Sequence, residues 1–431
     1  MAKKLVVNGM ILTFADEQFR WMNGSLAVDN GQIAAIGEKP GDWEGDDVEV
    51  IDAKGKLVLP GLINTHGHAA MALLRGYADD LPLHVWLQDK IWPIEARFDA
   101  AHVATGTQLA MLEMIRTGTT CFADMYSDEE AVAAKVEEAG MRASLALGVI
   151  GLCSDDEAKE KINRSKAFVK TWHKQAQGRV TTMLAPHAPY TCPPDFLMRL
   201  VEASHELDVP LHIHVSETAK EVEDHVKHYG KRPVEHLLEL GVFDRPTLVA
   251  HAVHVNAEEI AIFLQKGAGI SHNPGSNLKL GSGIAPVPQM LHEGLHVSLG
   301  TDGPASNNNL DMFEEIRLAA LIHKGRQMAP LAVPADIALK MGTIYGAECL
   351  QLADQVGSLE VGKRADFIMV DAEQAHFYPR HDLISHLVYS ASGADVTDVY
   401  VNGKALMRNR EFLTIDKERV IAEAVRLAEK F

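Results

Sequence analysis

The sequence lacks the features of a disulfide framework. Only four cysteines occur in 431 residues, and no two of them have the close spacing of a Cys-type zinc site. The chain is long enough to bury a large core without cross-links. We therefore expect a protein of a reducing compartment, the cytoplasm.

Positive charge and long apolar runs are also scarce. The chain has 41 Lys and Arg residues against 59 Asp and Glu residues, a formal net charge of −18. Such a surface repels phosphate backbones and anionic lipid, so we expect neither nucleic acid nor a membrane as a partner. No apolar run approaches the roughly 18 residues that cross a bilayer. The apolar start of the chain is interrupted by Asn8-Gly9, which predicts a hairpin turn.

The two ends of the chain resemble each other and differ from the middle. Short strand-like segments, separated by Asn-Gly or Asp-Asn-Gly turns, occupy residues 1–59 and return at 358–409. We expect residues 1–59 and 358–431 to form the two parts of one small β-sandwich. An amphipathic helix near 416–431 is expected to pack against this unit or against the middle of the chain.

Residues 60–357 alternate between apolar strand-like segments and helical segments. This pattern predicts an α/β fold, a closed (β/α)₈ TIM-type barrel, with the terminal β-sandwich as a second domain. The rival, an open nucleotide-binding sheet, requires a glycine-rich phosphate loop after its first strand. Here Pro60-Gly61 instead precedes a His-x-His segment. The expected barrel strands are 57–63, 119–124, 142–149, 180–185, 211–215, 247–251, 268–271 and 297–300.

Polar residues gather where these strands end, which is where barrel enzymes carry their reactive groups. His66 and His68 are two apart on an extended segment, so their imidazoles point the same way and suit a divalent ion such as zinc. His214 and Asp302 can complete a ligand set with a position open for water. The pattern leaves two choices open. His212 has the same parity as His214, so the pattern does not decide which of the two is the metal ligand. His251 is either a further ligand or a partner of the water.

The residues His66-Gly67-His68, His214-x-x-Glu217, His251 and Thr301-Asp302 resemble the amidohydrolase superfamily. The longer segments PGLINTHGHAAMALLRGYADDLPLHVWL, SHNPGSNLKLGSG and LGTDGPASNN are similar to its methylthioadenosine/S-adenosylhomocysteine deaminase branch. The terminal segments VDNGQIAAIG and GSLEVGKRADFIMVD also match, so the resemblance covers nearly the whole chain. Guanine deaminases and triazine hydrolases share many of these motifs.

The resemblance implies hydrolytic deamination of an adenosine-type nucleoside to its 6-oxo product and ammonia. It implies one divalent metal per subunit, Zn²⁺ with Fe²⁺ and Mn²⁺ as alternatives, and its ligands would be His66, His68, His214 and Asp302. His251 and Asp302 would hold and deprotonate the water, and Glu217 would move protons to and from the ring. The implied substrate contacts are Glu95, His187, Glu217 and Asp302.

One departure from the branch bears on the substrate. In a member of this branch, one arginine just before the glycine that ends strand three and another in the following loop contact the amino-acid carboxylate of S-adenosylhomocysteine. Here Leu147 precedes Gly148, and Arg164 lies a few positions beyond the loop. Since a carboxylate would lack a bidentate partner, we predict 5′-methylthioadenosine or adenosine over S-adenosylhomocysteine.

The segment 69–98 is expected to fold over the barrel mouth. Its Trp86 and Trp92 either form an apolar wall for a methylthio group or only pack. The rival functions are another amidohydrolase, such as a guanine deaminase or s-triazine hydrolase, and, more remotely, a non-catalytic assembly module. The module is disfavoured because all four candidate metal ligands are present. Family resemblance makes a homo-oligomer plausible.

Overall fold

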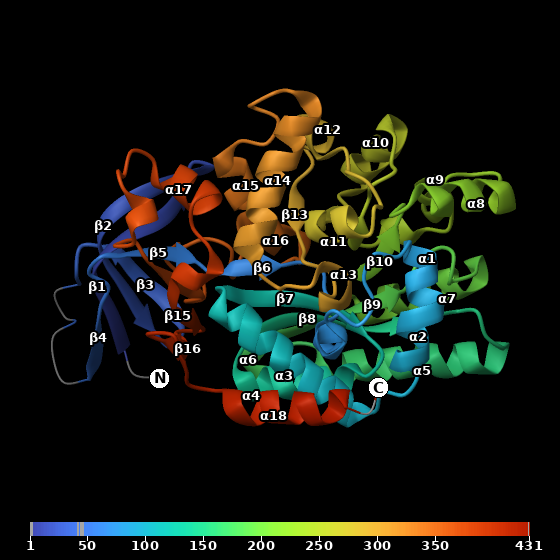
Figure 1. Ribbon diagram of the computed structural model, residues 1–431, viewed down its shortest axis with the longest axis horizontal. Coiled ribbons are helices and arrows are strands. Elements are labelled where there is room, and N and C mark those ends of the chain that lie inside the picture. The colour runs from blue at the N-terminus through green and yellow to red at the C-terminus, as the bar shows by residue number, and fades with distance from the viewer. Residues whose placement is uncertain (1–2, 41–42, 44–46, 430) are drawn as a thin grey trace.

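The structure, a computed structural model, describes residues 3–40, 43, 47–429 and 431. Within these residues, eight parallel strands form one sheet, and nine strands from both chain ends form a second, mixed sheet. Figure 1 shows the blue N-terminal strands and the red C-terminal strands together at one side of the molecule. The predicted fold class, a TIM-type barrel with a β unit built from both termini, is confirmed.

The barrel strands pair in sequence order, and a backbone hydrogen bond of 2.9 Å from Thr65 N–H to Leu299 O links the last strand to the first. Almost every residue in these strands is buried, which explains their continuous apolar sequence. The strands are β6 (Leu62–Asn64), β7 (Thr119–Tyr126), β8 (Arg142–Val149), β9 (Val180–Pro186), β10 (Leu211–Val215), β11 (Thr247–His251), β12 (Gly269–His272) and β13 (Val297–Leu299).

Helices connect the barrel strands and cover the outside of the barrel (Figure 1). Side-chain caps define several starts: Ser154 and Glu157 form a capping box at one helix, and Asn256 and Glu259 form another. The long connecting helices are α3 (Ala100–Arg116), α4 (Glu129–Ala139), α5 (Asp155–Trp172), α7 (Pro194–Leu207), α8 (Ala219–Tyr229), α10 (Ala257–Lys266) and α14 (Met312–Gln327).

The single strand expected over 57–63 is two strands that belong to different sheets. β5 (Lys56–Pro60) pairs with strands of the mixed sheet, and β6 begins the barrel. The chain changes sheets at Gly61, whose N–H donates to Asp366 O, while the next N–H, of Leu62, donates to Gly118 O. A Cβ at Gly61 would lie 2.0 Å from Thr120 Oγ1, so this close approach requires glycine.

The hairpin turn expected at Asn8-Gly9 is wrong. β1 (Lys3–Ala15) runs through both residues with a shift in register against β2 (Gln18–Asp29), which is a β-bulge. The turn lies at Asp16 and Glu17, both with positive φ. The other strands of the mixed sheet are β3 (Gln32–Gly37), β4 (Val48–Asp52), β14 (Phe367–Asp371), β15 (Val396–Val401), β16 (Lys404–Arg408) and β17 (Glu411–Phe412).

Two contacts attach the chain ends to the barrel. Arg142 at the start of β8 forms a buried bidentate ion pair with Asp366, at 2.8 and 3.2 Å, and also donates to Asn402 Oδ1 at 2.6 Å. The expected terminal helix is α18 (Lys417–Ala428), which packs along α3 of the barrel. In the described part of the chain, no helix has both the length and the apolarity that crossing a membrane requires.

Candidate metal centre and cavity

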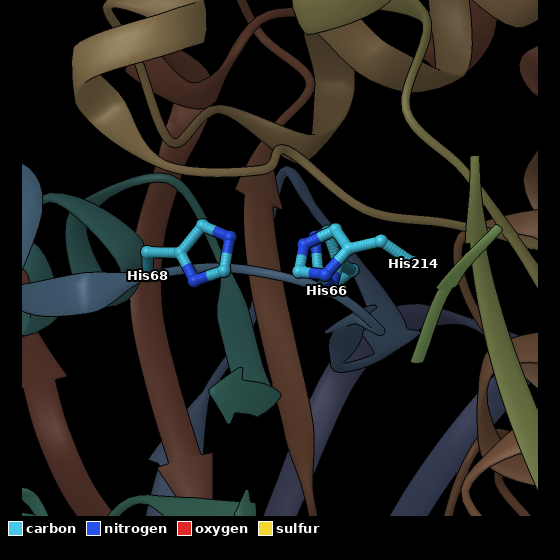
Figure 2. Close-up of side chains that lie close together, drawn as sticks. All are labelled: His66, His68 and His214. Carbon is cyan, nitrogen blue, oxygen red and sulfur yellow. The ribbon is translucent and has the colours of Figure 1, made fainter. Parts of the chain in front are cut away.

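Three histidines meet at the carboxyl ends of two barrel strands. His66 and His68 follow β6, and His214 lies in β10 across the barrel. Figure 2 shows their rings turned toward one another, and their ligand nitrogens lie within 4.8 Å of each other. His212, which shares the parity of His214, lies behind His66 instead, because side chains of one strand face enter the barrel at different depths.

The hydrogen bonds of these three rings leave one nitrogen of each available. Each Nδ1 has a partner: Met125 O at 2.7 Å for His68, His187 O at 2.7 Å for His214, and His212 Nε2 at 2.9 Å for His66. A carbonyl only accepts, so Nδ1 carries a proton in His68 and His214, and in the neutral form of each ring Nε2 has a free lone pair. Nε2 of His66 is buried without any hydrogen-bond partner. Such a nitrogen indicates a site for a cation.

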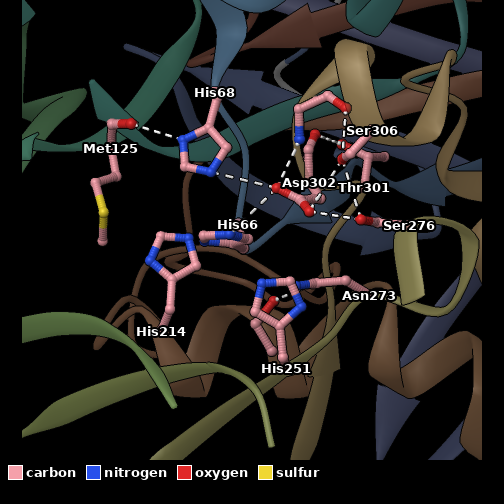
Figure 3. Close-up of polar contacts among 12 residues, drawn as sticks. His66, His68, Met125, His214, His251, Asn273, Ser276, Thr301, Asp302 and Ser306 are labelled. Atoms are coloured by element: carbon pink, nitrogen blue, oxygen red, sulfur yellow. Dashed lines mark hydrogen bonds and ion pairs between the residues drawn. The ribbon is translucent and has the colours of Figure 1, made fainter. Parts of the chain in front are cut away.

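Asp302 completes the group. Its Oδ1 lies 3.3 Å from His68 Nε2 and 3.5 Å from His66 Nε2 (Figure 3). Ligands bound tetrahedrally at about 2.1 Å lie about 3.4 Å apart, so this spacing suits a metal ion. The hydroxyls of Ser276 and Ser306 donate to Oδ2 at 2.6 and 3.1 Å and fix the carboxylate.

The protonation states of the group also suit a divalent cation. Burial lowers the pKa of His66 and His214, so both imidazoles are neutral. Burial opposes ionisation of Asp302, but the nearby rings of His66 and His68 outweigh burial and hold the Asp302 pKa well below its usual value. At His68, Asp302 outweighs burial and raises the pKa to about 9, so this ring holds a proton that binding of a cation would displace. Three imidazoles and one carboxylate are a donor set that fits zinc.

His251, at the end of β11, stands beside this group. The side-chain amides of Asn273 and Asn277 donate to its Nδ1 at 3.2 and 2.9 Å. The proton of the neutral ring therefore lies on Nε2, which makes this nitrogen a hydrogen-bond donor rather than a metal ligand. Burial lowers the pKa of His251 to about 3, so the ring stays neutral.

Glu217 lies three residues beyond His214, in the loop that follows β10, and its Oε2 is 3.7 Å from His251 Nε2. The carboxylate of Glu221 accepts hydrogen bonds of 2.8 Å from the backbone N–H groups of Ser216 and Glu217 and so positions this loop. Burial, and next the charge of Asp302, raise the pKa of Glu217 well above its usual value. This shift favours the neutral carboxyl group, the form that can donate a proton.

Strained backbone occurs at the same strand ends. Ser216, His251 and Asp302 have φ values of 53°, 75° and 62°. Non-glycine residues rarely adopt this region, which costs on the order of 1–3 kcal/mol per residue and is typical of functional sites. Two of these residues, His251 and Asp302, belong to the candidate metal group or lie beside it.

A cavity of about 360 Å³ opens above the group. The segment between β6 and α3 covers one side through the short helices η1 (Ala69–Leu74), α1 (Leu83–Val85), η2 (Trp86–Ile91) and α2 (Trp92–Glu95). Trp86 and Trp92 line the cavity, as do seven of the eight predicted site residues; His66 lies beneath it. These seven are His68, Glu95, His187, His214, Glu217, His251 and Asp302.

No lysine or arginine is among the described residues that line the cavity. Leu147 is 3% exposed and packs in the core outside the cavity, so Gly148 faces the cavity in its place. Arg164 lies at the surface, where it pairs with Asp128 and Glu130. The two arginine positions discussed for S-adenosylhomocysteine therefore supply no cation to the cavity.

Sequence reasoning missed three residues of this site. Tyr126 lines the cavity at the end of β7, two residues beyond the strand end that the sequence predicted. Ser276 and Ser306 bind Asp302 from helices α11 (Pro274–Lys279) and α13 (Pro304–Asn307). The position of Tyr126 at the end of a buried strand was a usable signal, and Ser276 and Ser306 lie within the segments SHNPGSNLKLGSG and LGTDGPASNN that carry the family resemblance.

Comparison with known proteins gives consistent results. Residues 57–406 match the Amidohydrolase family. A 5-methylthioadenosine/S-adenosylhomocysteine deaminase of Halalkalibacterium halodurans is 49% identical over 424 residues, 97% of each chain. An adenosine deaminase from Xanthomonas campestris, solved with bound zinc, is 35% identical with a TM-score of 0.92, covering 99% of this chain and 98% of that one. An atrazine chlorohydrolase from Arthrobacter aurescens, complexed with zinc, is 26% identical with a TM-score of 0.91 over 99% and 100%.

Proposed function

The chain belongs to the amidohydrolase family, and on this basis we propose that it is a metal-dependent hydrolytic deaminase of adenosine-type nucleosides. The reaction converts 5′-methylthioadenosine or adenosine to the 6-oxo nucleoside and ammonia. The observation that carries the proposal is the group of three histidines and Asp302 at the base of the cavity, with the buried carboxyl group of Glu217 beside it.

The proposed metal ligands are His66, His68, His214 and Asp302, and the proposed ion is Zn²⁺, which the two solved relatives also bind. The free Nε2 lone pairs and the buried, partnerless Nε2 of His66 support this ligand set. Bound by these residues, a divalent ion would lower the pKa of a water molecule from about 15.7 to about 7 and would thus provide a nucleophile at neutral pH.

The proton transfers are assigned to three side chains. Attack at C6 of the purine places charge on N1, and the neutral carboxyl of Glu217 donates a proton there. Asp302, which is ionised, accepts the first proton of the water and passes it to the amine as the C6–N bond breaks, and the C6 hydroxyl returns its proton to the Glu217 carboxylate to give the 6-oxo product. His251 holds the water through its Nε2–H.

Substrate recognition is assigned to the part of the cavity away from the candidate metal ligands. Glu95 accepts hydrogen bonds from the ribose hydroxyls, and His187 contacts the purine. Trp86 and Trp92 form the apolar wall that suits a methylthio group. The lack of lysine and arginine among the described lining residues supports a substrate with an uncharged 5′ substituent.

A spectrophotometric deamination assay tests the proposal. Purified zinc-loaded protein is offered 5′-methylthioadenosine, adenosine, S-adenosylhomocysteine, guanine and a chloro-s-triazine. We expect the first two to be deaminated most efficiently. Exclusive turnover of guanine or the triazine would replace the proposal with the corresponding alternative hydrolase.

Two further expectations accompany this function. We propose that residues 60–357 form the catalytic unit and that 1–59 and 358–431 form its β-rich partner. We also propose a cytoplasmic location, which is supported by four cysteines that are all unpaired in the described chain.

A further inference from the structure

One contact in the cavity joins the barrel wall to the segment that covers it. The Tyr126 hydroxyl, at the end of β7, donates to Glu95 Oε1 across 2.5 Å. This distance is typical of a charge-assisted O–H···O⁻ hydrogen bond. Burial raises the pKa of Tyr126 well above its usual value, so the phenol keeps its proton and remains a donor.

The Glu95 carboxylate depends on this one donor. In the described part of the chain, Tyr126 is the single side chain that hydrogen-bonds to it, and no lysine or arginine lines the cavity. Glu95 lies on the four-residue helix α2, and its side chain has three rotatable torsions. Without the bond from Tyr126, no other side chain of the described residues would fix the direction of the carboxylate. The bond uses one lone pair of Oε1 and leaves Oε2 free to accept from a ligand.

Tyr126 itself is on a rigid frame. It is 7% exposed, its backbone pairs with Leu147 of β8, and its N–H donates to the buried carboxylate of Glu129 at 2.8 Å. The phenol is therefore fixed by the barrel, whereas Glu95 comes from the covering segment. A group that is positioned by a rigid element loses less conformational entropy when it binds.

We propose that Tyr126 is a positioning residue that orients the Glu95 carboxylate toward the two vicinal ribose hydroxyls of the substrate. This inference rests on the proposed function, in which Glu95 accepts from those hydroxyls. Tyr126 acts through Glu95 on substrate binding, so its removal affects KM and leaves the chemical step, which occurs at the other end of the nucleoside, nearly unchanged.

The test uses Tyr126→Phe, which removes one oxygen and keeps the ring. Kinetics are measured on the zinc-loaded protein with adenosine and with 2′,3′-dideoxyadenosine, which lacks both hydroxyls. We expect the KM for adenosine to rise about 10-fold, the fold-change that corresponds to a charged hydrogen bond of about 1.5 kcal/mol. We expect kcat to stay within about twofold, and the KM for the dideoxy compound not to change.

Two further variants separate positioning from a structural effect. Glu95→Gln should raise the KM for adenosine, and adding Tyr126→Phe to it should have no further effect. Tyr345→Phe, which removes a hydroxyl from a ring stacked on His296 outside the cavity, should leave both KM values unchanged. Together, these variants link the effect of Tyr126 to the carboxylate of Glu95.

Three results would overturn the inference: an unchanged KM for adenosine, an equal change for the dideoxy compound, or an effect of Tyr126→Phe that persists in the Glu95→Gln background. Failure of the proposed function is distinguishable, since the wild-type protein would then deaminate neither nucleoside. In that case the inference falls together with the function.

Discussion

Replacing the methylthio group of the substrate with the homocysteine tail of S-adenosylhomocysteine should lower kcat/KM substantially. The described residues that line the cavity include the carboxyl groups of Glu95, Glu217 and Asp302 but no lysine or arginine. A carboxylate that enters this cavity loses water without gaining a cationic partner, at a cost of about 1–3 kcal/mol. With about 1.4 kcal/mol per tenfold, the expected loss is about 5- to 140-fold.

The assay compares the two substrates directly. Both contain the same adenine ring, so the same absorbance change reports deamination of each. As an engineered complement, Ile150→Arg places a guanidinium at a lining position and should raise kcat/KM for S-adenosylhomocysteine relative to 5′-methylthioadenosine. The matched control, Ile150→Leu, keeps the site apolar and should leave the ratio unchanged.

Equal or better turnover of S-adenosylhomocysteine by the wild-type protein would refute this reasoning. It would mean that a cation outside the lining reaches the tail. Lys161 is then the residue to test, because its Nζ lies 2.8 Å from Ile150 O at the edge of the cavity. Loss of that turnover in Lys161→Met would identify it as the carboxylate partner.

Four other outcomes are expected. Glu217→Gln should lower kcat about 10²- to 10⁴-fold while zinc content by elemental analysis stays stoichiometric, and an unchanged kcat would contradict the role of proton donor. Treatment with a chelator should abolish deamination and zinc should restore it, whereas activity of metal-free protein would contradict the metal centre. Arg142→Met leaves the Asp366 carboxylate buried without its ion-pair partner and should lower the free energy of unfolding by about 3–5 kcal/mol, measured by chemical denaturation. The surface variant Arg164→Met should lower it by about 0–1 kcal/mol. Burial raises the pKa of Glu221 from 4.5 to about 7, so folding retains a proton that the unfolded chain releases. The Tm of the wild-type protein minus the Tm of Glu221→Gln should therefore decrease as pH rises from 4.5 to 7. A Tm difference that does not change with pH would contradict this.

The sequence predicted the barrel because buried parallel strands have a distinctive pattern. Mostly apolar segments such as β8 and β11 can be recognised without any knowledge of their neighbours. Once eight of them alternate with helices, the barrel topology brings all strand ends to one face. His66, His214 and Asp302, far apart in the chain, were therefore expected to meet, and the structure places them together.

Local sequence patterns could not predict where turns occur within the mixed sheet or where the chain passes from one sheet to the other. Asn8-Gly9 has the composition of a hairpin turn, yet β1 continues through it as a bulge because strands on both sides pair with it. The apolar run at 57–63 looks like one strand, but Gly61 passes so close to Thr120 that the chain changes sheets there. Both outcomes depend on partners that lie tens to hundreds of residues away.

The amino-acid sequence alone determined which residue types stand at the strand ends, and therefore the kind of chemistry. Only the tertiary structure decided how each side chain is used. His212 and His214 have identical parity, and their depth in the barrel separates a residue behind His66 from one that faces the cavity. The bond between Tyr126 and Glu95 joins a strand to a covering helix, and such a contact arises from packing, which no periodicity in a single chain encodes.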